Sequence, residues 1–155
     1  MRSRVWCRYR RSAHHASRMQ NPKKLAVYGE ARELAVAVYR LTRPFPREEQ
    51  FALTRQLRRA AVSVGSNIAE GCGHKGGRAL IPYLHHSIGS ANEVEFQTEL
   101  AGRRGYCSSA EVDVVLERVL RTRRMLIRLE ASIQRDLEGG NAPPPTHDPP
   151  PDQPR

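Results

Sequence analysis

The sequence predicts an all-α protein, an antiparallel up-and-down four-helix bundle with disordered tails at both ends. Apolar residues recur at steps of three and four through most of residues 25–138, and no strand-like alternation of convincing length accompanies them. Only 6% of the 155 residues are aromatic, so aliphatic side chains and alanines must fill the core, which suits close-packed helices. Short connections divide the periodic stretch into four helices of similar length, and such helices pack as an antiparallel bundle.

The first helix is expected over residues 25–42. Its inward face carries aliphatic residues at helical spacing, namely Leu34, Val38 and Leu41. Pro44 and Pro46 follow, and they are expected to force a turn because proline disfavours helical backbone at the residue before it.

The second helix is expected to begin near Arg47, because Glu48 and Glu49 suit the positive N-terminal end of a helix dipole. It should end within residues 71–77, GCGHKGG, whose glycines accept left-handed backbone angles. A helix of that length forms a rod of about 35 to 40 Å. Its core stripe consists of Leu53, Leu57, Ala60, Ala61, Val64 and Ile68.

Polar side chains flank this core stripe. Ser63, Asn67 and Glu70 are spaced by four and three residues, which places them in one row beside the apolar face. The row is either a set of solvated groups or part of a subunit interface or polar network. The other faces of the same helix carry three arginines, namely Arg55, Arg58 and Arg59.

The third helix is expected over residues 78–104, with Pro82 in its first turns, where proline is tolerated. Gly89, Ser90 and Ala91 leave a narrow waist, so a helix of the same chain or of another subunit can approach closely. The expected core positions are Leu80, Leu84, Ile88, Ala91, either Val94 or Glu95, and Thr98.

The fourth helix is expected over residues 109–138, after a serine that caps it. Its heptad positions, with Thr122 as the exception, are apolar: Val112, Val115, Val119, Leu126, Leu129 and Ile133. A basic run wraps the outer face of the helix, and it consists of Arg121, Arg123, Arg124 and Arg128. This run is either a solvated surface, offset by Glu117 and Glu130 on adjacent turns, or a phosphate-binding one.

Residues 51–71, FALTRQLRRAAVSVGSNIAEG, resemble the signature QxRRAAxSxxxNIAEG of bacterial four-helix-bundle proteins described as 23S ribosomal RNA intervening-sequence proteins. A second similar stretch, residues 83–106, contains a Gly-Ser pair followed by a glutamate pair, here Gly89, Ser90, Glu93 and Glu95. Gly65 stands where the family is expected to carry proline, so a kink there becomes optional. The residues that match the signature are Gln56, Arg58, Arg59, Ala60, Ala61, Ser63, Asn67, Ile68, Ala69, Glu70 and Gly71.

The resemblance covers residues 25–137 and implies properties that periodicity does not. Related bundles assemble into rings of five subunits, so it implies a homopentamer. The chain is also similar to the accessory bundle proteins of diversity-generating retroelements, which act with a reverse transcriptase and bind nucleic acid. The residues expected at a subunit interface or in a polar network are Ser63, Asn67, Glu70, Gly89, Ser90 and Glu93.

The formal net charge of +10 lies mostly outside the predicted bundle. Residues 1–24 carry eight positive side chains and no acidic one, whereas residues 139–155 carry one arginine and two aspartates, which leaves +3 for the bundle. The basic arm, with Trp6 and Tyr9 among its arginines, is either a nucleic-acid contact or a disordered segment, or lies upstream of a true start at Met19. The proline-rich residues 139–155 are expected to form a disordered tail.

The sequence contains no recognisable catalytic, cofactor or metal site. His85 and His86 are adjacent, so they point about 100° apart on a helix and cannot chelate one ion together. No Glu-x-x-His pair, nucleophile elbow or phosphate loop is present. The three cysteines lack paired spacing and no export signal accompanies them, so we expect a cytoplasmic protein. No apolar run is long enough to cross a membrane, and no membrane contact is expected.

These observations predict a non-enzymatic, homo-oligomeric bundle that binds RNA or DNA through the arginines of the second and fourth helices and the basic arm. The alternative is a protein-interaction or scaffold module, in which the polar row and the glycine waist form the subunit contact and the arginines keep the assembly soluble. Basic groups gathered in one continuous patch on the assembled ring would favour nucleic-acid binding, whereas scattered and balanced charges would favour the scaffold.

Overall fold

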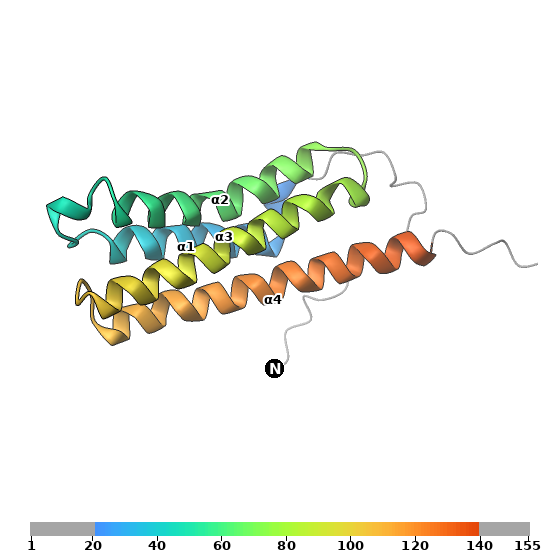
Figure 1. Ribbon diagram of the computed structural model, residues 1–155. Helices are drawn as coiled ribbons and strands as arrows, with labels where there is room; N and C mark the ends of the chain where they lie inside the picture. The colour runs from blue at the N-terminus through green and yellow to red at the C-terminus, as the bar shows by residue number, and fades with distance from the viewer. Residues whose placement is uncertain (1–20, 140–155) are drawn as a thin grey trace, which may run out of the picture.

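The computed structural model describes residues 21–139, and within them the chain forms four long helices (Figure 1). They are α1 (Ala26–Leu41), α2 (Leu53–Gly73), α3 (Gly77–Arg103) and α4 (Ser109–Gly139). Two single-turn 3₁₀ helices, η1 (Pro22–Lys24) and η2 (Arg47–Glu49), precede α1 and α2. The described residues contain no strand, so the predicted all-α four-helix fold is confirmed.

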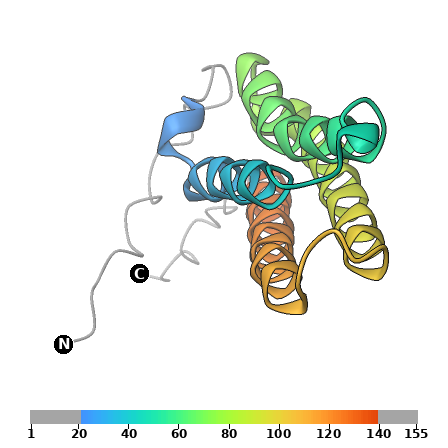
Figure 2. The ribbon, with the colours of Figure 1, turned by 90° about the vertical axis from the view of Figure 1, so that its left-hand side faces the viewer.

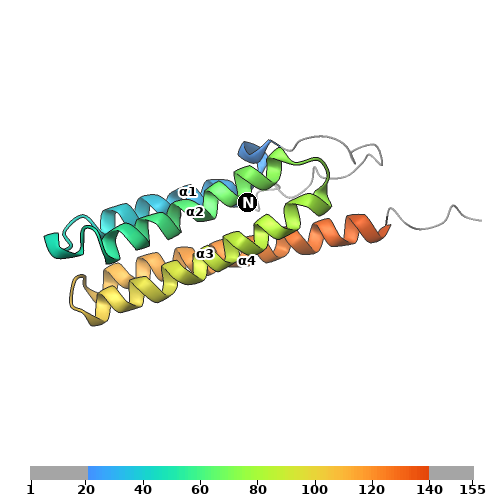
Figure 3. The ribbon, with the colours of Figure 1, turned by 45° about the horizontal axis from the view of Figure 1, so that its top comes forward.

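Each helix packs against its neighbours in the chain, and α4 returns to contact α1. The diagonal pairs, α1 with α3 and α2 with α4, have no Cα atoms within 8 Å of each other in residues 21–139. The end-on view shows the four helices surrounding one core (Figure 2). The α1–α2 and α3–α4 connections lie at the same end (Figures 1 and 3), where the rings of Phe45 and Tyr106 are 5.7 Å apart. The arrangement is the predicted antiparallel bundle.

The core of the bundle is aliphatic, as the low aromatic content predicts. Each helix contributes a fully buried leucine: Leu34, Leu57, Leu84 and Leu126. Between the two candidates on α3, Val94 is buried and Glu95 is half-exposed. Thr98 and Thr122 are also fully buried, and their hydroxyl groups have no hydrogen-bond partner within the described residues. These two polar positions sit where the apolar periodicity places core residues.

The predicted start of the second helix near Arg47 is wrong. Arg47–Glu49 forms the separate turn η2, and the backbone of Ala52, with φ −106° and ψ −109°, interrupts the helix before Leu53. The Glu49 carboxylate lies just outside α2 and accepts a hydrogen bond from the Leu53 N–H at 3.2 Å. The 21 residues of α2 span about 31 Å at 1.5 Å per residue, so the helix is shorter than the predicted rod.

The remaining boundaries lie close to the predicted ones. Helices α1, α3 and α4 begin and end within one residue of expectation, and α2 ends at Gly73, inside the predicted segment. Residues 22–24, which were predicted to belong to the arm, form η1, and the Asn21 side chain caps this turn by accepting a hydrogen bond from the Lys23 N–H. Gly139, which was predicted to belong to the tail, is the last residue of α4, and the predicted tail residues 1–20 and 140–155 lie outside the described residues. On the predicted core stripe of α2, Leu53 is only half-buried, and its neighbour Thr54 is buried.

Gly71, the last residue of the signature, lies close to side chains of α3 before the turn that connects the two helices. A Cβ at this position would stand 2.5 Å from Leu80 Cδ1 and 2.7 Å from Tyr83 Cβ. A side chain there would push the two helices apart, so the close approach requires glycine. Gly65 makes no comparable approach, since a Cβ there would meet only Ala31 Cβ at 3.7 Å, and α2 runs through it without interruption.

Candidate nucleic-acid interface

The three predicted arginines of α2 gather around one groove on the outer surface of α1 and α2. Arg55 and Arg59 are exposed, and Arg58 is half-buried. We define the aromatic groove as the hollow of about 510 Å³ lined by Tyr39, Gln50, Phe51, Thr54, Arg55, Arg58, Arg59 and Val62. No carboxylate is among these lining residues, so the groove combines positive charge with apolar surface.

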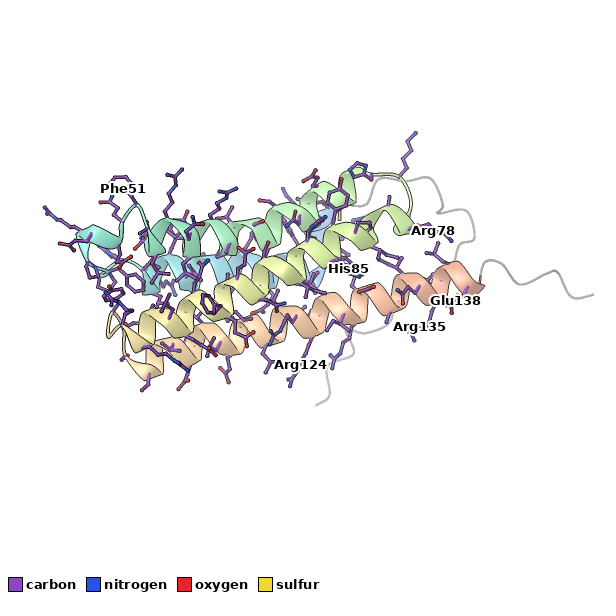
Figure 4. All side chains as sticks on the ribbon, in the orientation of Figure 1. Phe51, Arg78, His85, Arg124, Arg135 and Glu138 are labelled. Atoms are coloured by element: carbon purple, nitrogen blue, oxygen red, sulfur yellow. The ribbon has the colours of Figure 1, made fainter. Side chains whose placement is uncertain are left out.

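Three of the residues that line the aromatic groove have exposed apolar side chains. Phe51 is 79% exposed, Tyr39 48% and Val62 46%. Figure 4 labels Phe51 at the end of the bundle that carries the α1–α2 connection. Sequence reasoning missed these residues as site candidates. The available signal was that Tyr39 and Phe51 fall outside the apolar periodicity of their segments, so no core position accounts for them.

Arg58 is held in place by contacts within the bundle. Its Nε donates a hydrogen bond to Thr42 Oγ1 at 2.8 Å, at the C-terminal end of α1. Its guanidinium carbon lies 4.8 Å from the centroid of the Tyr39 ring. A cation over a ring face is attracted by the ring quadrupole, and the contact fixes the orientation of both side chains. Arg58 therefore joins α2 to α1 and sets the wall of the aromatic groove.

The arginines of α4 have different surroundings. Arg121 Nε lies 3.1 Å from Glu30 Oε2 on α1, and Arg118 donates to the other oxygen of the same carboxylate at 3.0 Å. Arg123 donates to the Glu95 carboxylate on α3 and to Asn92 Oδ1. Arg124 and Arg128 are exposed and have no ion pair within residues 21–139.

Glu30 and Arg118 were not among the predicted site residues. Glu30 is only 8% exposed, and it is held at the α1–α4 contact by two guanidinium groups. The sequence offered a signal here, because Glu30 lies three residues after Val27 and four before Leu34, on the core face of α1. A buried carboxylate requires a charged partner, but 88 residues separate Glu30 from Arg118, so the partner was not apparent.

The seven predicted arginines do not form one patch on a single chain. Helices α2 and α4 are diagonal partners without contact in the described residues, so their basic side chains point to different sides of the bundle. Figure 4 shows this separation, with Phe51 near the start of α2 and Arg124 projecting from α4 on the opposite side of the view. One copy of the chain therefore presents two separate basic faces.

The predicted polar row is only partly a network. Asn67 Nδ2 donates to Ser63 Oγ at 3.2 Å, and Ser90 Oγ on α3 donates to the same oxygen at 3.1 Å. This Ser63–Asn67–Ser90 cluster joins α2 to α3. Glu70, Gly89 and Glu93 are exposed, and neither glutamate has a hydrogen bond within the described part of the chain.

A second, smaller hollow of about 190 Å³ adjoins the cluster. Its lining residues are Gln56, Arg59, Ala60, Ser63, Ser90 and Glu93. Arg59 therefore lines both hollows. The smaller hollow is also lined by the carboxylate-bearing residue Glu93. A Cβ added to Gly89 would meet no atom within 4 Å, so the predicted waist is open on its outer side.

The cysteine and histidine side chains within residues 21–139 lie in ordinary packing and hydrogen-bonding surroundings. Burial raises the pKa of the Cys72 thiol, and burial together with the Glu111 carboxylate raises that of Cys107, so the protonated thiols are favoured. His74 Nε2 lies 2.7 Å from the Tyr83 hydroxyl, against whose ring it stacks. In residues 21–139 no three His, Cys, Asp or Glu side chains are placed to hold a metal ion. None of the described helices has the length and apolar composition needed to cross a membrane.

Comparison with known proteins relates both the sequence and the fold to one group. A sequence model for a family described as 23S rRNA-intervening sequence protein matches residues 23–128. A similar solved structure, from Bacteroides thetaiotaomicron, is described as a protein with unknown function from the S23 ribosomal protein family. The two chains are 23% identical, with a TM-score of 0.61 over 68% of this chain and 98% of that one, which shows a shared fold. No curated protein matches the chain.

Proposed function

Because the chain belongs to the 23S rRNA-intervening sequence protein family, we propose that it is a non-enzymatic, homo-oligomeric, cytoplasmic bundle that binds RNA or DNA through basic side chains. The observation that carries the proposal is the aromatic groove, where three arginines surround exposed apolar side chains and no carboxylate lines the walls. A polyanion gains affinity on such a surface by releasing its condensed counterions to solution.

Arg55 and Arg59 are the principal phosphate ligands in this proposal. They stand one helical turn apart on α2, both are exposed, and neither has an ion pair within the described residues. Guanidinium groups in this state can exchange water for phosphate oxygens without first breaking an internal contact. Arg58 has a supporting role because its Nε is engaged by Thr42.

Oligomerisation gives the second basic face a role. Arg124 and Arg128 of α4 lie too far around the bundle to join the α2 arginines on the same chain. In a ring, which the family resemblance suggests has five copies, α4 of one copy and α2 of another can contribute to one continuous basic surface. The open outer side of Gly89 and the exposed side chains of Glu70 and Glu93 are available for the subunit contact.

A scaffold or protein-interaction module is the second candidate, and a separate observation favours it. Phe96 on α3 is 66% exposed and Leu100 is 38% exposed, and both lie outside the aromatic groove. Exposed apolar side chains beside Glu93 and Glu99 suit a protein partner better than a polyanion. In that case the α2 arginines serve solubility or a subunit contact.

The proposal is tested by binding measurements over a salt series with short single- and double-stranded RNA and DNA. The full chain is compared with a chain that begins at Met19, which retains every described residue and loses six arginines of the arm. Arg55→Gln/Arg59→Gln is the test variant and Glu33→Gln/Glu117→Gln the control for fold and mass, measured by circular dichroism and light scattering.

We expect the chain from Met19 to bind with a steep salt dependence. If both arginines contact phosphates of a single strand, the double variant should reduce the log–log salt slope by about 1.4. Absence of binding by the chain from Met19, in an assembly of unchanged mass, would contradict the proposal and favour the scaffold. If the double variant still binds with an unchanged salt slope, the arginines of α2 do not contact the nucleic acid, and the α2 face is not part of the binding surface.

A further inference from the structure

Phe51 is the most exposed large apolar side chain in the described part of the protein. It lies in the irregular segment between η2 and α2, and 79% of its surface is open. Tyr39 of α1 and Val62 of α2 extend this apolar surface across the aromatic groove. An apolar surface rimmed by charged side chains marks an interaction site, and the charges around it indicate what it binds.

The charges at the groove favour a polyanion with flat apolar groups. Arg55 and Arg59 are exposed at the rim, and Arg58 is fixed over the Tyr39 ring at 4.8 Å. The nearest acid in sequence, Glu49, is engaged by the Leu53 N–H and the Tyr106 hydroxyl. Aromatic rings interleaved with arginines are the combination that holds single strands, in which bases stack on rings and guanidinium groups meet phosphates.

A buried threonine also lines this groove. Thr54 is only 5% exposed, it lines the groove, and its Oγ1 has no hydrogen-bond partner within residues 21–139. The hydroxyl oxygen itself is closed to solvent, so a base in the groove does not reach it without a local rearrangement. The exposed Gln50 at the rim carries both a donor and an acceptor.

Resting on the proposed function, we infer that the aromatic groove binds an unpaired base of a single-stranded nucleic acid, with Phe51 as the stacking platform. A hollow of about 510 Å³ lies within the range of volumes of small-ligand sites. A duplex cannot use it in the same way, because paired bases keep their faces within the stack and show only their edges. The groove therefore selects unpaired segments, while the arginines supply affinity for any phosphate backbone.

The test separates bases from phosphates. Binding by the chain from Met19 is measured with a single-stranded RNA, with an abasic strand of equal length and with a duplex. Phe51→Ala should weaken binding of the base-bearing strand by about 5- to 150-fold and leave the abasic strand and the duplex unchanged. Phe51→Leu keeps an apolar side chain but no ring, and it should weaken binding of the base-bearing strand as much as Phe51→Ala does. Phe51→Trp keeps a ring and should retain binding. Phe96→Ala, at an exposed phenylalanine outside the groove, is the matched control.

Phe51→Trp also reports stacking directly. The chain from Met19 lacks Trp6, so the introduced indole is its sole tryptophan, and a stacked base should quench its fluorescence where an abasic strand does not. Equal binding of base-bearing and abasic strands, with Phe51→Ala without effect, would overturn the inference and leave the proposed function intact. A change in oligomer mass on Phe51→Ala, without loss of strand binding, would overturn it by assigning the groove to a second copy of the chain. If no strand bound at all, both the inference about the groove and the proposed function would be contradicted.

Discussion

Arg121 and Arg123 of α4 reach carboxylates on neighbouring helices, whereas Arg55 and Arg59 of α2 reach none within the described residues. In sequence the two groups look alike, and the α4 group is the denser. Glu30 and Glu95, which lie on α1 and α3, decide the difference. A basic run therefore indicates a binding surface only where the opposing helices leave its charges unmatched.

The same comparison applies within α4. Arg124 and Arg128 lie on the outer face, but Arg121 and Arg123 point sideways toward α1 and α3. Spacing alone does not make this division, because Arg121 and Arg124 are three positions apart and share a helical face. The carboxylates of Glu30 and Glu95 on the neighbouring helices make it. The four arginines thus divide into two that connect helices and two that face solvent. This division predicts separate effects on stability and on binding.

The largest effect on stability is expected for Glu30, the buried partner in two ion pairs. Glu30→Ala removes the acceptor for both Arg118 and Arg121 at the α1–α4 contact. We expect the free energy of unfolding to fall by about 2 kcal/mol, because hydrogen bonds to charged groups are lost and the arginines regain water only in part. Urea unfolding followed by circular dichroism measures it. Glu33→Ala, at an exposed position of the same helix, is the control, and equal midpoints for the two variants would contradict the assignment.

A smaller effect is expected for the α3–α4 pair. A double-mutant cycle of Arg123→Gln and Glu95→Gln should give a coupling energy of about 1 kcal/mol, since both side chains are partly exposed. Arg124→Gln is one position away and has no such partner in the described residues, so its unfolding free energy should stay within about 0.5 kcal/mol of the parent. If Arg124→Gln proved as destabilising as Arg123→Gln, the division of the α4 arginines would be wrong.

The fold followed from the sequence because its determinants are local. Apolar spacing places Leu34, Leu57, Leu84 and Leu126 in the core without knowledge of their partners. The start of α2 did not follow, because Glu49 is shared between the Leu53 N–H and Tyr106, which is 57 residues away. The propensity argument put Glu48 and Glu49 at the start of the helix, but they lie in the turn before it, and the argument did not predict the break at Ala52.

The site was less predictable than the fold. Ser63, Asn67 and Ser90 form the polar contact that their spacing allowed, but Glu70 and Glu93 point to solvent, and spacing on one helix cannot distinguish these outcomes. The aromatic groove needed the α1–α2 packing, which brings Tyr39 beside Arg58. Contacts between helices, rather than patterns within one, determine which charged residues are available.

Arg58 belongs to both groups of arginines that are compared above, because it connects α2 to α1 and also lines the proposed binding groove. Arg58→Lys keeps the positive charge but loses the Nε hydrogen bond to Thr42 and the guanidinium contact over the Tyr39 ring. We expect a loss of about 0.5 kcal/mol in unfolding free energy, with the salt slope of strand binding unchanged. Arg55→Lys should change neither quantity. A reduced salt slope in Arg58→Lys would show that its guanidinium contacts phosphate directly.

The smallest effect concerns the starts of the two helices, which are held differently. Glu49, before α2, is fixed by the distant Tyr106, whereas Glu111 of α4 bonds only to Ser108, accepting from its N–H at 2.9 Å and from its hydroxyl at 2.7 Å. These bonds, the N–H first, lower the pKa of the Glu111 carboxyl below its ordinary value. A lowered folded pKa means that the stabilisation is complete above the unfolded pKa, about 4.3, and is lost as the pH falls through the folded value.

Glu111→Gln should therefore be less stable than the parent at pH 6, and the difference should close as the pH approaches 3. Thermal unfolding at a series of pH values measures this gap, and Glu117→Gln, farther along the same helix, should show no such closing. A stability gap that stays constant from pH 6 to pH 3 would mean that the variant is weaker because the amide makes poorer hydrogen bonds than the carboxyl group, and not because the negative charge is lost. The start of α4 would then depend on hydrogen-bond geometry rather than on charge. In that respect it would resemble the start of α2, although Glu111 and Glu49 have different hydrogen-bond partners.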